Sequence, residues 1–270
     1  PAQCGTAFDS ALEPCDSDGH GTHTMGTIIG GDGGGPFDMD IGVAPGAKWM
    51  ACMGCDGYYS GGLDECSDAA LTRCAQWVVA PTDLNDQNPD PAMAPDVVNN
   101  SWGGGGADDW YYSYVEAWNA ANIIPVFSAG NAGPGCSTLG SPGSYDNVIG
   151  VGGTDSADNN YAASSRGPGL GTGIFAVLKP DIAAPGEQVQ SSVHTGDGDY
   201  ATYSGTSMAA PHVAGLVALL RSVNPILDRQ MVWDLLTQNA VTDTLGIKNG
   251  SWCGAGPGFP NYVFGYGRID

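Results

Sequence analysis

Short apolar runs alternate along this chain with runs that have a helical pattern of apolar residues. We predict strands at residues 47–51, 96–99, 123–128 and 148–151, because each run is short, apolar and mostly β-branched. Such an alternation is typical of a parallel sheet that is covered by helices. The sequence therefore predicts an α/β fold, and we expect a single domain over residues 1–270.

Helices are expected between these strands. Four runs carry apolar residues at helical spacing, the pattern of a helix that buries one face. We interpret their apolar and aromatic positions as core packing, and the proline-rich stretch 81–95 as a surface insertion. The four predicted helices lie around residues 71–78, 111–118, 208–222 and 227–235.

The chain is strongly acidic. Its 270 residues include 8 Lys and Arg against 29 Asp and Glu, which gives a formal net charge of −21. We interpret most of these acidic residues as a solvated surface, which repels nucleic acid and anionic membranes, so neither is expected as a partner. The longest apolar runs are also too short to span a bilayer.

Eight cysteines, an even number, favour disulfides in an oxidising compartment, so we expect a secreted, extracellular protein. Sequence alone does not choose among the 105 possible pairings. The shortest loops available would be closed by Cys4–Cys15 and Cys55–Cys66. A zinc site is the alternative for the cysteines at 52, 55, 66 and 74. It is disfavoured because seven residues separate the last two, more than in a zinc knuckle.

Two glycine-containing segments carry reactive side chains. His20 stands between two glycines in residues 18–27, so a substrate backbone could pass close to its imidazole. Ser207, in residues 203–215, opens a long apolar helix. A hydroxyl there lies beside unsatisfied N–H groups and the positive end of the helix dipole, which favours the formation of an oxyanion.

Two further polar segments each follow an apolar strand. One contains Asn131, in residues 127–133, and the other is residues 99–104. Ligands of open α/β sheets bind beyond the carboxyl ends of the strands. We therefore expect both segments at the same edge of the sheet.

Together these segments resemble the subtilisin-like serine proteases (subtilases, peptidase family S8). His-Gly-Thr-His at 20–23, Ser-Ala-Gly-Asn at 128–131 and Gly-Thr-Ser-Met-Ala-x-Pro-His-Val-Ala-Gly at 205–215 occur in the family's order. The resemblance covers nearly the whole chain. With Val-Asn-Asn-Ser-Trp-Gly at 98–103, it is similar to the bacillopeptidase F-type branch. It implies a three-layer subtilisin-like fold with a mostly parallel, twisted sheet and helices on both faces.

The resemblance also implies a serine endopeptidase that works through an acyl-enzyme. Ser207 would attack the peptide carbonyl, and His20 would take its proton and return it to the leaving amine. The Asn131 side chain and the Ser207 backbone N–H would stabilise the oxyanion. The other histidines, His23 and His212, are interpreted as packing or hydrogen-bonding residues, with the remaining one, at position 194, in a surface loop.

Substrate residues are implied in the same way. Ser101, Trp102 and Gly103 would pair with an extended protein or peptide substrate by strand addition. Gly140 would form the base of the first pocket and leave room for a large apolar side chain. The resemblance further suggests a monomer, a propeptide in the precursor and a Cys52–Cys74 disulfide.

No cofactor is expected for the chemistry. Structural calcium is possible, with oxygens from residues 31–33 and 38–40, but no loop fits the EF-hand pattern and no metal ligand is assigned.

The family's third catalytic residue is missing from its usual place, since no Asp-Thr-Gly or Asp-Ser-Gly motif precedes His20. We favour an aspartate on a first strand upstream of Pro1, and then expect low activity from this chain alone. A substitute acid is the second explanation, and an acid between His20 and Ser207 is the third. The candidates within the chain are Asp9, Asp16, Asp18 and Asp181, of which the second and third are interpreted mainly as shaping their loop.

Two rival functions follow. A catalytically impaired pseudo-protease or peptide-binding domain is favoured only by the missing aspartate. An α/β-hydrolase esterase is disfavoured, because it would place its serine before its histidine in the chain, whereas His20 comes first here.

Overall fold

The computed structural model describes residues 2–3, 15–31, 33, 35, 39–56, 65–83, 85–169, 173–175, 177–254 and 256–270. The chain divides into two compact units, and each is described by itself. Unit 1 comprises Pro1–Pro95 and Gln190–Ala201, and unit 2 comprises Asp96–Val189 and Thr202–Asp270. The helices are α1 (His20–Ile29), α2 (Asp68–Val79), α3 (Tyr112–Ala120), α4 (Thr206–Val223) and α5 (Arg229–Gln238), with 3₁₀ turns η1 (Pro91–Met93) and η2 (Gly173–Phe175).

A four-stranded parallel sheet forms the centre of unit 2, in the order β10-β9-β7-β5. Every residue of β7 and β9 is buried, and β10 is buried except at its last residue, whereas β5 at the edge is mostly half-buried. Strands covered on both faces need apolar side chains in both directions, which is why these runs are continuous and do not alternate. The strands are β5 (Val97–Asn100), β7 (Ile124–Ser128), β9 (Ile149–Thr154) and β10 (Ile182–Pro185).

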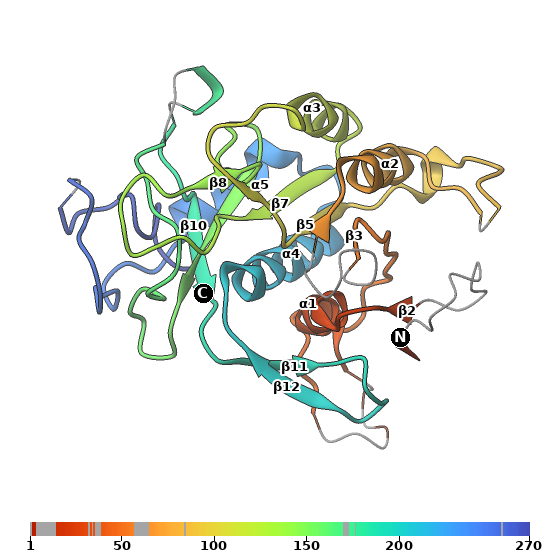
Figure 1. Ribbon diagram of the computed structural model, residues 1–270, viewed down its shortest axis with the longest axis horizontal. Coiled ribbons are helices and arrows are strands. Elements are labelled where there is room, and N and C mark those ends of the chain that lie inside the picture. The colour runs from red at the N-terminus through yellow and green to blue at the C-terminus, as the bar shows by residue number, and fades with distance from the viewer. Residues whose placement is uncertain are drawn as a thin grey trace. The chain divides into compact units, whose positions relative to one another are not determined.

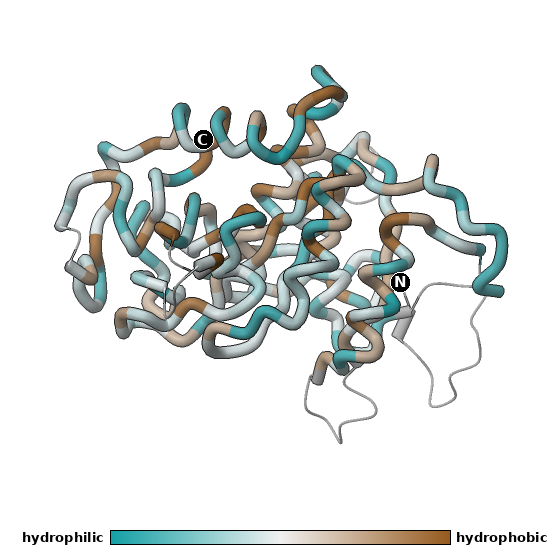
Figure 2. The backbone as a smooth tube through the Cα atoms, turned by 90° about the horizontal axis from the view of Figure 1, so that it is seen from above, coloured by the Kyte–Doolittle hydropathy of each residue, from teal (hydrophilic) through white to brown (hydrophobic). Residues whose placement is uncertain are grey.

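Helices cover the two faces of this sheet (Figure 1). The helix α4 packs along all four strands, while α3 packs on β7. Phe127 of β7 stacks on Trp118 of α3. Because side chains alternate along a strand, the neighbours of Phe127 point to the opposite face, where α4 lies. Hydrophobic stretches lie inside these layers and hydrophilic ones in the outer turns (Figure 2).

Small side chains allow α4 to lie close to the sheet. Ala209, Ala210, Val213, Ala214 and Val217 are all fully buried. An 18-residue helix that buries one continuous face is stabilised mainly by that packing, which tolerates Pro211 within its first turns. The predicted helices at 111–118, 208–222 and 227–235 are therefore confirmed as α3, α4 and α5.

Unit 1 is built around two helices. The first, α1, begins directly at His20 and packs against residues 190–201: Ser191 Oγ donates to the His23 carbonyl at 2.8 Å. The second, α2, begins after Ser67, whose hydroxyl accepts from the N–H of Ala70 at 3.2 Å, an N-cap. Short strand pairs complete the described part of this unit: β1 (Ala2–Gln3) with β2 (Cys15–Asp16), and β3 (Cys55–Asp56) with β4 (Glu65–Cys66).

The remaining short strands also form pairs. β6 (Gly104–Gly105) pairs with β8 (Gly140–Ser141) in unit 2, and β11 (Val189–Ser192) pairs with β12 (Tyr200–Tyr203).

The predicted strands at 96–99, 123–128 and 148–151 are confirmed as β5, β7 and β9. The strand predicted at 47–51 is wrong, because these residues have no strand conformation. Lys48 and Trp49 are exposed, so this run does not have the two buried faces that its apolar residues suggested. The described part of the insertion at 81–95 is mostly exposed, as expected.

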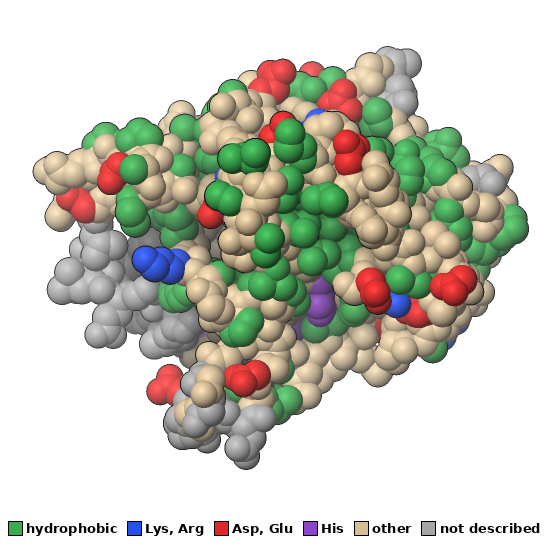
Figure 3. Space-filling model, turned by 180° about the vertical axis from the view of Figure 1, so that it is seen from behind, with side chains coloured by type: hydrophobic (Ala, Val, Ile, Leu, Met, Phe, Trp, Pro, Cys, Tyr) green, Lys and Arg blue, Asp and Glu red, His purple; other side chains and the backbone are tan. Residues whose placement is uncertain are grey.

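Acidic side chains are more frequent than basic ones on the face seen from behind (Figure 3), in keeping with a net charge of −21. In the described residues, none of the helices is long and apolar enough to be a membrane span.

Candidate active site

Ser207 lies in the first turn of α4, in unit 2. Gly205 caps this turn: it accepts from the N–H of Met208 at 3.0 Å and donates to the carbonyl of Gly186 at 2.7 Å. The first N–H groups of a helix have no partner within the helix, and the helix dipole adds positive potential at this end. The half-buried Ser207 hydroxyl is therefore held where negative charge on a neighbouring oxygen is stabilised.

Asn131 is bound to the same helix end. Its Oδ1 accepts from the N–H of Thr206 at 2.8 Å, and the Thr206 hydroxyl lies 3.0 Å from the same oxygen. A backbone N–H only donates, so the amide atom that faces it must be the oxygen. The NH₂ group of Asn131 therefore points away from Thr206, and the side chain is exposed to solvent. The role of Thr206 as this anchor was not predicted.

Ser101 joins the end of β5 to the serine of α4. The Ser101 hydroxyl donates to the carbonyl of Ser207 at 2.8 Å, and the Ser207 hydroxyl donates to the carbonyl of Ser101 at 3.2 Å. The second distance is long for an O–H···O hydrogen bond, so this bond is weak. A better acceptor could replace the Ser101 carbonyl as the partner of the Ser207 hydroxyl.

Trp102 fixes the next part of the segment by aromatic packing. Its ring meets Tyr111 edge to face at 4.9 Å and Phe127 at 5.5 Å, and its indole N–H donates to Asn100 Oδ1 at 3.2 Å. Edge-to-face pairs at these separations each stabilise by about 0.5–1.5 kcal/mol beyond area burial. The segment after β5 is therefore positioned by the core and not only by its own turn.

Two predicted glycines lie where backbones approach closely. A Cβ on Gly140 would lie 2.5 Å from the carbonyl oxygen of Gly104, and one on Gly103 would lie 2.9 Å from that of Ser141. The first contact lies within the antiparallel pair of β6 and β8, and the second lies at the residue just before β6. The pairing explains Gly140 by itself, whatever the size of the side chain that a substrate places beside it.

The structure thus brings Ser207, Asn131 and Ser101 together in unit 2, at the carboxyl ends of β5 and β7, as the sequence predicted. Trp102, Gly103 and Gly140 belong to the same unit.

His20 is the first residue of α1, in unit 1. Its backbone N–H donates to Asp18 Oδ2 in the preceding loop, at 3.1 Å. Gly19 has a φ of +94°, a conformation that side chains other than that of glycine rarely adopt. His194 lies in the turn between β11 and β12, as expected for a loop residue, and its half-buried ring lies against Gly19.

Asp16 organises the loop in front of His20. Its Oδ1 accepts from the N–H groups of Asp18 at 3.1 Å and Gly19 at 2.9 Å, and its Oδ2 accepts from the N–H and hydroxyl of Thr22 at 2.7 and 2.6 Å. Burial raises the pKa of Asp16, but these hydrogen bonds outweigh it, so the pKa lies below its ordinary value. Both oxygens are engaged by the N-terminus of α1, which supports the loop-shaping interpretation of Asp16.

Asp181 is occupied by a buried network in unit 2. It forms an ion pair with the buried Lys179, and its carboxylate also accepts from the N–H of Gly150 at 2.6 Å and the indole N–H of Trp233 at 2.9 Å. These partners explain Asp181 as a structural residue. The remaining acid candidate, Asp9, lies outside the described residues.

The other two histidines have the packing roles predicted. His23 is fully buried, with Nε2 3.2 Å from the carbonyl of Ala201. His212 Nδ1 lies 2.8 Å from the carbonyl of Met208, and burial lowers the pKa of its imidazole.

The predicted disulfides Cys52–Cys74 and Cys55–Cys66 are confirmed, and the structure adds Cys136–Cys253. Zinc at these cysteines is therefore excluded. Cys4–Cys15 lies outside the described side chains.

The calcium-binding hypothesis gains no support from the described residues, where no group of three His, Cys, Asp or Glu side chains could hold a metal ion. Of the three aspartates in the two candidate segments, Asp40 is described, whereas Asp32 and Asp38 lie outside the described residues.

The α/β unit, with a serine at a helix N-terminus and an asparagine beside it, fits the class of subtilisin-like proteins. The Subtilase family model matches residues 9–267, and the chain belongs to that family. It is 40% identical to bacillopeptidase F of Bacillus subtilis (strain 168) over 98% of this chain and 17% of that protein. It is 33% identical to subtilisin DY of Bacillus licheniformis, over 83% of this chain and 71% of that protein.

Solved structures agree with the fold. Sphericase matches 96% of this chain and 81% of its own, with a TM-score of 0.71 and 27% identity. The three-layer subtilisin-like fold and the resemblance to the bacillopeptidase F branch are thereby confirmed. The chain spans only 17% of bacillopeptidase F, and 53% of the serine protease AprX of Bacillus subtilis (strain 168), to which it is 34% identical.

Proposed function

We propose that this chain is the catalytic domain of a serine endopeptidase, over residues 1–270. Ser207 is the nucleophile, His20 the general base, and Asn131 with the Ser207 N–H the oxyanion hole. The observation that carries the proposal is the anchoring of Asn131 Oδ1 on Thr206, at 2.8 Å from its N–H. It leaves the NH₂ group of Asn131 free of any hydrogen bond within the described residues, beside the start of α4.

The chemistry begins at the Ser207 hydroxyl. His20 accepts its proton as the oxygen attacks the peptide carbonyl, and the hydroxyl gives up its weak bond to the carbonyl of Ser101. The carbonyl oxygen becomes negatively charged as the tetrahedral adduct forms. Asn131 and the Ser207 N–H donate to it, and each such donor lowers the barrier by about 3–4 kcal/mol. His20 then returns the proton to the leaving amine, and water hydrolyses the acyl-enzyme.

Substrate binding falls to the segment after β5 and to β8. An extended peptide adds as a strand beside Ser101, Trp102 and Gly103, whose backbone supplies donors and acceptors. Gly140 lies at the floor of the pocket that receives the side chain before the cleaved bond.

The acid that orients His20 is not assigned among the described residues. Asp16 and Asp181 have all their described carboxylate oxygens engaged by other groups. Neither of these two carboxylates is therefore proposed as the acid that orients His20. Apart from the missing aspartate motif, no observation favours the pseudo-protease alternative.

The family supports several further proposals. Its members act on proteins, and we propose a protein or peptide substrate, synthesis with a propeptide and secretion. The three disulfides among the described residues support an oxidising compartment. We also propose a monomer that needs no cofactor for the chemistry.

A fluorophosphonate probe tests the function directly, because only an activated serine reacts with it readily. We expect labelling at Ser207, identified by mass spectrometry of the labelled peptide, together with hydrolysis of unstructured protein substrates. Ser207→Ala should abolish both, and Ser204→Ala, a matched serine three residues earlier, should retain both. Absence of labelling in the folded full-length protein would reject the proposal.

A further inference from the structure

The loop that follows Asn131 runs over residues 132–139 and reaches Gly140. Its two ends are held differently. Gly140 is fixed by the pairing of β8 with β6 and by its N–H bond to the carbonyl of Ala129 at 3.1 Å. Asn131 is exposed, its side chain is bound by Thr206, and Gly130 before it exchanges bonds with the Thr206 hydroxyl at 3.1 and 3.2 Å. The loop is therefore the support of Asn131 on its C-terminal side, next to the bonds with Thr206 on the other side.

The loop is laid against residues 162–167. The N–H of Gly133 donates to the carbonyl of Ala163 at 2.9 Å, and the N–H of Ala132 donates to Ser165 Oγ at 3.1 Å. Thr138 and Arg166 exchange two bonds: the N–H of Thr138 donates to the Arg166 carbonyl at 2.9 Å, and the N–H of Arg166 donates to Thr138 Oγ1 at 3.0 Å. These bonds connect the second half of the loop to Arg166.

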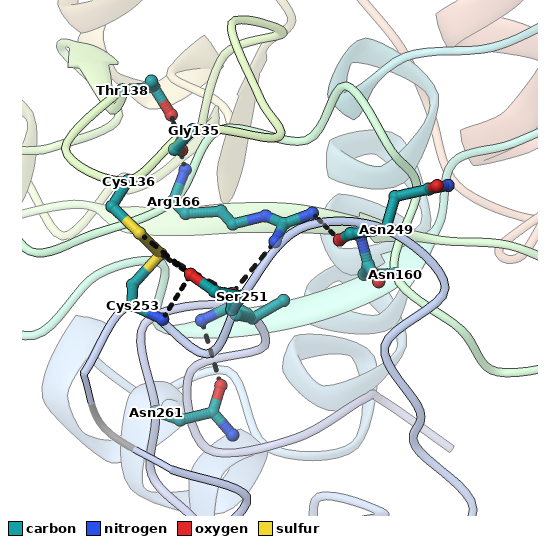
Figure 4. The surroundings of a disulfide bond; sticks show 10 residues. Gly135, Cys136, Thr138, Asn160, Arg166, Asn249, Ser251, Cys253 and Asn261 are labelled. Carbon is teal, nitrogen blue, oxygen red and sulfur yellow. Dashed lines mark hydrogen bonds between the residues drawn. A yellow bond between two sulfur atoms is a disulfide. The ribbon is translucent and has the colours of Figure 1, made fainter.

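Arg166 then reaches a third segment through its side chain, which is fully buried. Its Nη2 donates to the carbonyl of Asn249 at 2.6 Å and its Nη1 to that of Ser251 at 3.0 Å (Figure 4). A guanidinium can bind two carbonyls in a fixed fork, which the single ammonium of a lysine cannot do. A Cβ on Gly250 would lie 2.3 Å from Arg166 Nη1, so this segment wraps closely around the guanidinium.

The Cys136–Cys253 disulfide closes the circle. Cys136 lies in the loop and Cys253 lies two residues after Ser251, whose hydroxyl is 3.4 Å from Cys136 Sγ (Figure 4). The connections run from Thr138 to Arg166, on to residues 249–251, and back through the disulfide to the loop. We call this ring of connections the loop clamp.

We infer that Arg166 and the Cys136–Cys253 disulfide are positioning residues for the oxyanion hole: the loop clamp holds Asn131 in the orientation that catalysis requires. The inference rests on the proposed function and deepens it. Neither residue touches the substrate, and both act through the loop that carries Asn131. Displacing a catalytic group by about 1 Å can lower the rate by about 10²-fold, so loosening the clamp has a measurable effect.

The test uses two clamp variants of the full-length protein, Cys136→Ser with Cys253→Ser, and Arg166→Lys. The matched control is Cys55→Ser with Cys66→Ser, which removes a disulfide in unit 1. We expect each clamp variant to lower kcat for peptide hydrolysis by about 10- to 100-fold, with a smaller change in KM, because Asn131 acts mainly in the transition state. The control should retain kcat within about threefold, all assays being run well below the melting temperature of each variant.

A double-mutant cycle separates positioning from general stability. In an Asn131→Ala background, the clamp variants should lower kcat by less than about threefold further, because the residue they position is already gone. An equal loss in both backgrounds, no loss in either, or the same loss in the control would overturn the inference.

Reduction with dithiothreitol is a third experiment, which does not depend on the folding of a variant. The reagent reduces the exposed Cys136–Cys253 bond to two thiols and is itself oxidised to a cyclic disulfide, a transfer of two electrons and two protons. The fall in kcat should follow alkylation of Cys136 and Cys253 measured by mass spectrometry. A folded protein with this bond reduced and kcat unchanged would overturn the inference. Failure of the unmodified protein to react at Ser207 would instead reject the proposed function.

Discussion

Ser101 and Ser207 hold each other by reciprocal hydrogen bonds, in which the hydroxyl of each donates to the carbonyl of the other, at 2.8 and 3.2 Å. The pair joins the end of β5 to the start of α4. The segment proposed to bind substrate is therefore attached to the proposed nucleophile directly, and a shift of one moves the other.

Ser101→Ala tests this link. The variant keeps the Ser101 carbonyl but removes the donor to the Ser207 carbonyl, at a cost of about 0.5–1.5 kcal/mol in the free energy of unfolding. We expect kcat/KM to fall by less than about tenfold, since neither reacting group is removed. Urea denaturation and steady-state kinetics measure the two effects. A loss as large as that of Ser207→Ala would contradict the assigned role.

Asn131→Ala should lower kcat by about 10²–10³-fold and leave KM nearly unchanged, because the missing donor acts on the oxyanion and not on the bound substrate. Asn239→Ala, a change at the exposed end of α5, is the control. A change in KM without a change in kcat would show that Asn131 binds the substrate instead.

Gly140→Ala introduces a Cβ 2.5 Å from the carbonyl oxygen of Gly104 and should force β6 and β8 apart. We expect KM to rise, and most for substrates with a large side chain before the cleaved bond. Gly105→Ala, where an added Cβ has open space, should have little effect. Kinetics on a pair of peptides with alanine or phenylalanine at that position distinguishes the two variants.

Asp16→Ala should destabilise unit 1 by about 0.5–2 kcal/mol, the usual cost of losing a side-chain cap at a helix N-terminus. The pKa of Asp16 is lowered on folding, so its contribution is complete above the unfolded value, about 3.9, and is lost as the pH falls through the folded value. The difference in unfolding free energy between the two proteins should therefore be constant from pH 7 to about 5 and shrink below about 4. Denaturation at a series of pH values measures it, and a difference that grows toward acid pH would contradict this assignment.

Asp181→Asn should be among the most destabilising single changes, at about 3–5 kcal/mol, because it leaves the Lys179 ammonium buried without its counter-charge. The exposed Asp243 provides a control, and Asp243→Asn should change the unfolding free energy by less than about 0.5 kcal/mol. A small effect at Asp181 would mean that water reaches the pair.

The sequence predicted the main strands and helices of unit 2, because the hydrophobic pattern of each element lies within that element. The apolar run at 123–128 and the helical spacing at 111–118 each report burial by neighbours in the same element, and both became what they predicted. The strand prediction at 47–51 was wrong because it also used only local composition. Apolar composition does not reveal that Lys48 and Trp49 face solvent.

The sequence pattern could not predict hydrogen-bond partners that are distant along the chain. Arg166 binds backbone carbonyls 83 and 85 residues further along the chain. Every residue has a backbone carbonyl, so the residue type does not reveal such a partner. Thr206 could have been suspected, since a hydroxyl at the first position of a helix is placed to bind a neighbour. Its partner, 75 residues earlier, could not. The motifs thus predicted which residues gather at the end of the sheet, and the structure adds what holds them there.

The helix α4, which carries Ser207, packs against all four strands of the sheet. This packing affects how fast its amide hydrogens exchange. Amide hydrogens in its middle turns can exchange with deuterated solvent only when the whole unit opens, whereas those of the loop before Gly140 can exchange through local fluctuation. On heating, the helix that carries the nucleophile is then lost only when unit 2 unfolds cooperatively. Local fluctuations at lower temperature begin in the exposed turns.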